Sequence, residues 1–241
     1  MKILNKLAAK AGDHMNHEGV TIAFLGDSVT QGCFELYKKG EHGIETVFDK
    51  KHSYEMYLFD ILCSLYPNVT VNIINAGISG DTTKGGLARV ERDVVRHQPD
   101  LTVVCFGLND CSRHPEQIPG YVERLSEIFD RILAGGGELI FMTPNMMNPT
   151  LSPSLQDPDI IQAAERCMML QNEGHLSAYL DAARALCHER GIPVCDCYAI
   201  WQKLHESGVD VTELLANKIN HPTREMNRLF AVELWRTMLT K

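Results

Sequence analysis

The sequence lacks any long apolar run, and no stretch approaches the roughly 20 apolar residues that a membrane helix requires. Its N-terminal residues include two early lysines but no apolar core of signal-peptide length. Basic residues are also scarce, 23 Lys and Arg against 31 Asp and Glu, which gives a net charge of −8. Such a chain has no general attraction to nucleic acid or to anionic membranes. We therefore expect a cytoplasmic protein with a small-molecule ligand and no nucleic-acid or membrane partner.

Internal repeats, low-complexity tracts and linkers are absent as well. With 44% apolar residues over 241 positions, the chain can bury one sizeable hydrophobic core. We therefore expect a single domain over residues 1–241. Nothing in the sequence indicates an oligomeric state.

Cysteines are present, eight in number, but they do not have the spacing of a zinc site. Cys195 and Cys197 form a Cys-x-Cys pair, and on a strand their side chains would point to opposite faces. Reduced thiols are the usual state in the cytosol. The sequence therefore predicts no metal and no cofactor.

Short apolar runs rich in Val or Ile recur along the chain, and each ends at a glycine, a proline or a polar turn. Continuous runs of this kind are typical of strands that are buried on both faces of a parallel sheet. The runs are Val20–Leu25, Val69–Ile74, Leu101–Phe106, Glu138–Thr143 and Ile192–Cys195.

Segments with helical periodicity lie between these runs. They are Ser53–Tyr66, Leu87–His97, Tyr121–Leu133, Leu176–Arg190 and Pro222–Leu239. Alternation of strands and helices predicts an α/β fold, a three-layer α/β/α sandwich. In such sheets ligands bind outside the carboxyl ends of the strands, so the loops that leave those ends are the places to look for a site.

The first predicted strand ends in Gly26-Asp27-Ser28. A serine at the start of a helix that follows a buried strand has the position of a nucleophile, and its main-chain N–H is left unpaired by the helix. Serine and aspartate are also ordinary helix caps. The tripeptide alone therefore fits either a cap or a nucleophile.

Three further elements follow the later strands or precede the last helix. Gly80 lies in a glycine turn, where its N–H can approach a ligand closely. Asn109 carries an amide that can donate to an oxyanion without adding charge, although Asn-Asp is also a plain turn pair. His221 precedes the last helix, whose positive end disfavours an imidazolium, and a capping histidine is the alternative.

Taken in order, these elements resemble the SGNH branch of the GDSL esterase/lipase (acylhydrolase) family. The resemblance rests on the GDS tripeptide, the Asn-x-Gly-x-x-Gly stretch that ends at Gly80, the Gly-x-Asn-Asp stretch around Asn109, and the pair His221-Pro222. It implies a flavodoxin-like sandwich with a five-stranded parallel sheet. It also implies a serine ester hydrolase in which Ser28 is the nucleophile and His221 is the general base. The N–H groups of Ser28 and Gly80 and the amide of Asn109 would form the oxyanion hole.

The sequence departs from the family at one position. The family places an aspartate three residues before the histidine to orient the imidazole, and here that residue is Lys218. An ammonium group cannot accept the imidazole N–H. We expect a main-chain carbonyl near Lys218 to take this role, with an asparagine oxygen or the distant Asp210 as alternatives. Asp196 is expected to be a cap.

The resemblance also implies a range of substrates, because family members act on acetylated sugars, short acyl esters, thioesters and lysophospholipids. The acidic composition favours a short acyl group on a polar alcohol such as a carbohydrate. The alternatives are a thioesterase, a lysophospholipase or a catalytically weak ligand-binding relative. The irregular segment Pro144–Glu173 leaves the fourth strand on the site side and can wall the pocket. Its methionines 146, 147, 168 and 169 either line an acyl pocket or pack the loop onto the body.

Overall fold

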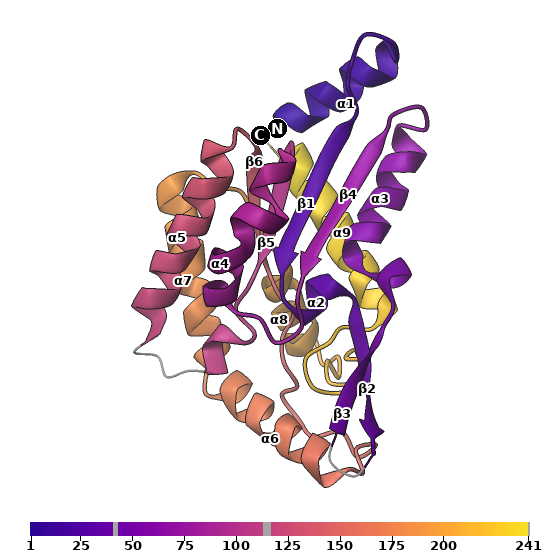
Figure 1. Cartoon of the computed structure of the whole chain (residues 1–241). Helices are drawn as coiled ribbons and strands as arrows, with labels where there is room; N and C mark the ends of the chain where they lie inside the picture. The colour runs from indigo at the N-terminus through magenta and orange to yellow at the C-terminus, as the bar shows by residue number, and fades with distance from the viewer. Residues whose placement is uncertain (41–42, 113–116, 241) are drawn as a thin grey trace.

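Five parallel strands form the central sheet, in a computed structural model that describes residues 1–40, 43–112 and 117–240 (Figure 1). This number of strands and their flavodoxin-like order confirm the fold that the sequence predicts. From one edge to the other the strands are β4 (Val71–Gly77), β1 (Val20–Gly26), β5 (Leu101–Cys105), β6 (Glu138–Thr143) and β7 (Val194–Asp196).

Helices cover both faces of this sheet, which confirms the three-layer architecture (Figure 1). On one face α3 (Tyr54–Leu65) packs against α9 (Arg224–Leu239). On the other face α5 (Ile118–Ala134) packs between α4 (Thr83–Asp93) and α7 (His175–Arg190). The remaining helical elements are α1 (Lys2–Gly12), α2 (Ser28–Gln31), α6 (Pro158–Asn172), α8 (Cys197–Glu206) and the 3-10 turns Lys50–His52, Val95–His97 and Asp110–Ser112.

Two elements beyond the carboxyl ends of the strands differ from the sequence prediction (Figure 1). An antiparallel hairpin of β2 (Cys33–Lys39) and β3 (Gly43–Phe48) was not predicted. The segment 144–173 was expected to be irregular, but its second half is α6. Pro158 opens this helix and the Asp157 carboxylate caps it by accepting from two main-chain N–H groups, so a start signal was present in the sequence.

Two smaller predictions are also wrong. The last helix begins at Arg224 with Thr223 as its cap, not at Pro222, which pairs with Leu215 in an isolated β-bridge. Cys195 and Cys197 do not point to opposite faces, because β7 ends before Cys197 and the chain turns into α8. Their sulfur atoms lie 3.7 Å apart in the core.

A close contact between β4 and α2 brings two of the predicted site loops together. Gly77, the last residue of β4, lies so near α2 that a Cβ atom on it would stand 2.3 Å from the main-chain nitrogen of Gln31 and 2.6 Å from the carbonyl carbon of Thr30. Asn75 bridges the same gap, because its amide donates to the Thr30 carbonyl at 2.7 Å and its oxygen accepts from the Gly77 N–H at 2.9 Å. The Asn-x-Gly stretch therefore sets the spacing of the two loops.

We expect Gly77→Ala to destabilise the fold by about 1–3 kcal/mol, because the added methyl group would meet main-chain atoms that cannot rotate away. Urea unfolding followed by circular dichroism measures this change. Gly12→Ala is the matched control, since a Cβ atom there has no neighbour within 4 Å. Equal stability of the two variants would contradict the close-contact interpretation.

Candidate active site

The predicted site residues lie at the carboxyl end of the sheet, where the strand order reverses between β1 and β5. Ser28 begins α2 directly after β1, and Asp27 caps this short helix by accepting from the Val29 N–H at 3.0 Å. Ser28 is buried, with 5% of its surface exposed. Asn109 follows β5 and Gly80 follows β4, so all three stand in loops that leave neighbouring strands.

The structure brings Ser28 and His221 into direct contact although they are 193 positions apart. Ser28 Oγ and His221 Nε2 lie 3.0 Å apart, and His221 Nδ1 lies 2.9 Å from the main-chain carbonyl oxygen of Phe34. A carbonyl can only accept, so Nδ1 carries the proton and donates it to this bond. Nε2 is then unprotonated and accepts from the Ser28 hydroxyl. This is the tautomer that a general base needs.

The acceptor is a main-chain carbonyl, as expected, but it comes from β2 and not from the loop around Lys218. Lys218 instead directs its ammonium to the Glu213 carboxylate at 2.8 Å. Asp210 accepts from the Thr212 N–H, and because Nδ1 is bonded to the Phe34 carbonyl, this alternative acid does not orient the imidazole. Asp196 is a cap, as expected, and accepts from the Ala199 N–H at the start of α8.

Arg224 holds the Phe34 carbonyl in place. Its guanidinium lies over the Phe34 ring, 4.4 Å from the centroid, and pairs with Glu35 at 2.6 Å and Asp49 at 2.8 Å. Because Arg224 is the first residue of α9, only three positions after His221, it fastens β2 to the segment that carries the imidazole. The sequence analysis did not identify Arg224 as a residue that holds β2. It could not identify the Phe34 carbonyl either, because every residue has a main-chain carbonyl.

Asn217 positions His221 from the other side. Its side-chain oxygen accepts from the N–H groups of Ile219, Asn220 and His221 at 2.9–3.0 Å. Asn217 is therefore not an acceptor for the imidazole, which was one of the alternatives. It shapes the turn in which Lys218 takes a left-handed φ of 59°.

The predicted oxyanion donors converge without a direct bond between them. The amide nitrogen of Asn109 donates to the Asp81 carbonyl at 2.9 Å and, through a longer bond of 3.4 Å, to the Asp27 carboxylate. Gly80 has φ 75°, which few residues other than glycine adopt readily. Within the described ranges, the main-chain N–H groups of Ser28 and Gly80 donate to no protein acceptor. They remain free for a ligand oxygen.

Burial dominates the electrostatics of this site. Burial lowers the pKa of His221 to about 4, and the bond to the Phe34 carbonyl offsets only part of this shift. Burial also raises the pKa of Asp27, next to Ser28, to about 7. The imidazole is therefore neutral over the physiological range and ready to accept a proton.

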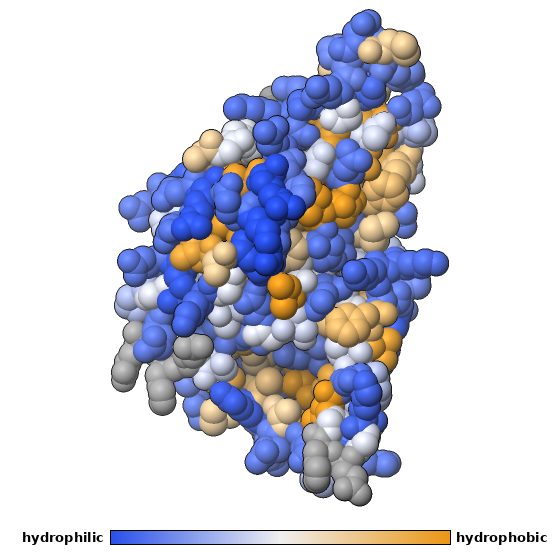
Figure 2. Space-filling view, viewed as in Figure 1, coloured by the Kyte–Doolittle hydropathy of each residue, from blue (hydrophilic) through white to orange (hydrophobic). Residues whose placement is uncertain are grey.

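A cavity of about 640 Å³ opens beside Asn109 and Asn220, and α6 forms its outer wall. Figure 2 shows this hollow above α6, with apolar atoms at its bottom and hydrophilic side chains along its rim. Met147 is the one predicted pocket methionine that lines it, and Met146 is buried in the core. Lys38 on β2 pairs with Asp159 on α6 at 2.6 Å, which joins the hairpin to the outer wall.

Among residues 1–40, 43–112 and 117–240, no group of three His, Cys, Asp or Glu side chains is arranged to hold a metal ion. In the same ranges, no helix is both long enough and apolar enough to cross a membrane.

The fold and this serine–histidine contact are those of an SGNH-type hydrolase domain. The model of the GDSL-like Lipase/Acylhydrolase family matches residues 24–229, and the chain belongs to this family. The matched range begins within β1 and ends within α9, so it includes all four predicted site elements.

Curated relatives are similar over part of their length. An acetylxylan esterase of Geobacillus stearothermophilus is 33% identical over 95 residues, which is 39% of this chain and 42% of the relative. An arylesterase of Vibrio mimicus is 37% identical over 73 residues, 30% of this chain and 36% of the relative. The matches thus span about two fifths or less of these relatives.

Solved structures are similar over nearly the whole chain. The acetylxylan esterase Axe2 from Geobacillus stearothermophilus superposes with a TM-score of 0.67 at 22% identity, covering 93% of this chain and 96% of Axe2. A two-domain esterase active on acetylated mannans gives a TM-score of 0.67 at 18% identity and covers 98% of this chain and 52% of the esterase. At such identities the likeness establishes the fold alone.

The buried imidazole generates a prediction about pH. We expect kcat/KM for a neutral ester to hold down to about pH 5 and to fall through an acid limb near pH 4, because only neutral imidazole accepts the serine proton. Stopped-flow hydrolysis in mixed buffers measures this fall in kcat/KM. The measurements stay below about pH 6, because Asp27 has a pKa of about 7 and titrates above that range. Circular dichroism over the same range separates the limb from unfolding. A limb near 6.5, the ordinary histidine value, would contradict the prediction.

Proposed function

We propose that this protein is a carboxylic ester hydrolase, one domain over residues 1–241, that cleaves short acyl esters through an acyl-serine intermediate. The observation that carries the proposal is the chain of hydrogen bonds from Ser28 through His221 to the Phe34 carbonyl. It supports Ser28 as the nucleophile and His221 as the general base. Membership of the acylhydrolase family supports the same reaction class.

In the proposed reaction Ser28 Oγ attacks the ester carbonyl carbon while His221 Nε2 takes the hydroxyl proton. The carbonyl oxygen gains the negative charge and accepts from the N–H groups of Ser28 and Gly80 and from the Asn109 amide. Collapse of the tetrahedral intermediate breaks the bond to the alcohol oxygen, which receives the proton from His221. Water then attacks the acyl-serine, His221 takes its proton, and the released serine regains it.

The imidazolium that forms in each step has no carboxylate beside it. The Phe34 carbonyl dipole and the rest of the site stabilise it less than an aspartate would. The low pKa of His221 has the same origin, because burial is not compensated by a negative charge. We therefore infer an enzyme that is slower than relatives with an orienting acid, but active.

For the substrate, we propose an acetyl or similarly short acyl group on a polar alcohol, with a carbohydrate as the favoured alcohol. The cavity beside Asn109 supports this choice, because Asp159, Gln162 and Arg166 offer polar groups above apolar Leu108 and Leu170. Relatives named as esterases of acetylxylan and of acetylated mannans support it as well. All eight cysteines are free, which supports the cytoplasm as the location.

Ser28→Ala should abolish hydrolysis of p-nitrophenyl acetate and covalent labelling by a fluorophosphonate, since only an activated serine reacts. The melting temperature should change little. Ser64→Ala, on the outer face of α3, is the matched control and should be labelled like the wild type. Labelling that persists in Ser28→Ala would assign the nucleophile elsewhere, and an unlabelled wild type would favour a ligand-binding relative without activity.

The substrate proposal predicts a falling series of rates with acyl length. Between the acetyl and the octanoyl p-nitrophenyl ester, kcat/KM should drop by roughly tenfold or more, because a site shaped for a short acyl group cannot accommodate the longer chain without misplacing the ester. Acetate release from acetylated xylo- and manno-oligosaccharides, compared with triacetin, then tests the alcohol. Rates that rise steadily toward decanoyl would replace this proposal with the lysophospholipase alternative.

A further inference from the structure

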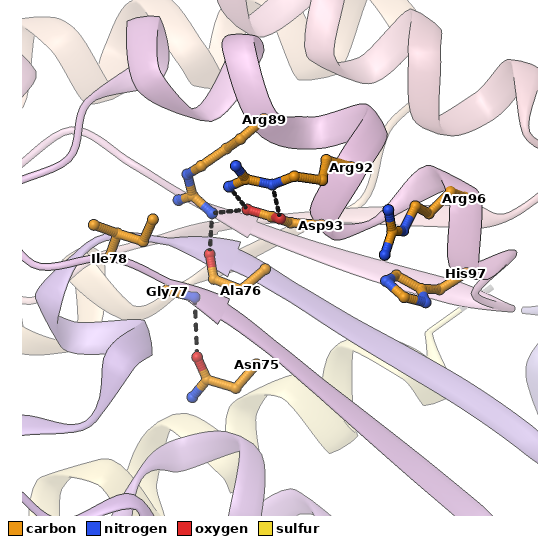
Figure 3. Close-up of a pocket in the computed structure, with 9 residues that line it drawn as sticks. All are labelled: Asn75, Ala76, Gly77, Ile78, Arg89, Arg92, Asp93, Arg96 and His97. Atoms are coloured by element: carbon orange, nitrogen blue, oxygen red, sulfur yellow. Dashed lines mark hydrogen bonds and ion pairs between the residues drawn. The ribbon is translucent and has the colours of Figure 1, made fainter.

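Arg89, in the middle of α4, is a charged side chain directed into the protein. Only 7% of the residue is exposed. Its guanidinium donates to the carbonyl of Gly26 at 2.9 Å, to the carbonyl of Ala76 at 2.5 Å and to the carboxylate of Asp81 at 2.8 Å. Figure 3 shows the guanidinium reaching from α4 to the end of β4. One side chain thus joins the ends of β1 and β4 to the loop that follows β4.

Two of these contacts lie within two residues of a predicted oxyanion donor. The Gly26 carbonyl stands two residues before Ser28, at the point where β1 enters α2. Asp81 directly follows Gly80, and its own carbonyl accepts the amide of Asn109 at 2.9 Å. The guanidinium therefore bonds to the segments that carry Ser28 and Gly80, and it is connected to Asn109 through Asp81.

The contact with Asp81 is built into the packing of α4. A Cβ atom on Gly85 would stand 1.8 Å from Asp81 Oδ1, so only glycine at this position leaves room for the carboxylate. Glycine is otherwise unfavourable inside a helix. Glycine at position 85 nevertheless leaves room for the Asp81 carboxylate beside α4, where the Arg89 guanidinium reaches it.

We propose that Arg89 is a positioning residue for the oxyanion hole, and this inference rests on the proposed function. The planar guanidinium binds two carbonyls and a carboxylate at once with charge-assisted bonds, which a single ammonium cannot reproduce in the same geometry. It holds the Ser28, Gly80 and Asn109 donors in one fixed arrangement before the charge develops. Preorganisation of this kind acts on the transition state and not on substrate binding.

The surroundings of Arg89 make the inference testable by chemical rescue. Arg89 lies at the bottom of an open groove of about 470 Å³ that Arg92, Arg96 and His97 border from the helical side (Figure 3). Removal of the Arg89 side chain would leave a space that is continuous with this groove. Guanidinium ions from solution can enter it and restore the missing donors.

Arg89→Ala should lower kcat for p-nitrophenyl acetate by roughly a hundred- to a thousandfold, the effect of a lost oxyanion donor, with KM within about twofold of wild type. Fluorophosphonate labelling of Ser28 should slow in parallel, because its P=O oxygen uses the same donors. The pH near 4 at which kcat/KM falls, which His221 sets, should not change. Asn109→Ala provides the reference size of the effect, and Arg92→Ala, whose guanidinium bonds to Asp93 and to no strand-end carbonyl among the described residues, should retain wild-type kcat.

Millimolar guanidinium chloride should restore kcat of Arg89→Ala by about tenfold or more and leave Arg92→Ala unchanged, because only the first variant has an empty guanidinium position. If Arg89→Ala does not fold, Gly85→Ala tests the same connection, since it displaces the Asp81 carboxylate and adds a residue that favours the helix. It should lower kcat selectively while the melting temperature holds.

Three results would overturn the inference: unchanged kcat in folded Arg89→Ala or Gly85→Ala, a loss confined to KM, or a loss of kcat that guanidinium does not restore. Activity that survives in Ser28→Ala would instead refute the proposed function itself. The two failures are therefore distinguishable. Loss of kcat that guanidinium does not restore would make Arg89 a support of the fold only.

Discussion

The hydrogen bond from His221 Nδ1 to the Phe34 carbonyl is the contact on which the rest of the site depends. It selects the tautomer that leaves Nε2 free for the Ser28 hydroxyl. Because the acceptor is a neutral dipole, the imidazole remains buried without a balancing charge, and its pKa falls to about 4. The bond requires that β2 stays beside the segment that carries His221. Arg224 keeps the two together, because its guanidinium lies over the Phe34 ring and pairs with Glu35 and Asp49.

The opposite side of the site depends on close approach of main-chain segments. Gly77 lets β4 touch α2, and Asn75 bonds across the contact. Arg89 donates hydrogen bonds to the carbonyls at the ends of two strands, β1 and β4, and to the Asp81 carboxylate. In the proposed mechanism, a neutral imidazole thus lies on one side of Ser28 and the N–H donors lie on the other.

Much of this arrangement could be predicted from the sequence. Buried strands such as Leu101–Cys105 are continuous apolar runs, and the order of Ser28, Gly80, Asn109 and His221 follows the order of the strands. The hairpin was missed because charged residues interrupt both strands and most of its residues are partly buried or exposed, so no alternating apolar face stands out. The partner of Nδ1 was assigned to the wrong segment because a main-chain carbonyl has the same chemistry at every residue. Only the path of the chain decides which one lies near.

Strand β2 carries two attachments at its two ends. Near its start the Phe34 carbonyl holds the imidazole, and near its end Lys38 binds Asp157 and Asp159 at the start of α6. One short extended segment, from Phe34 to Lys38, thus connects the wall of the cavity to the imidazole of His221. A displacement of α6 would therefore act on the same segment that holds the imidazole.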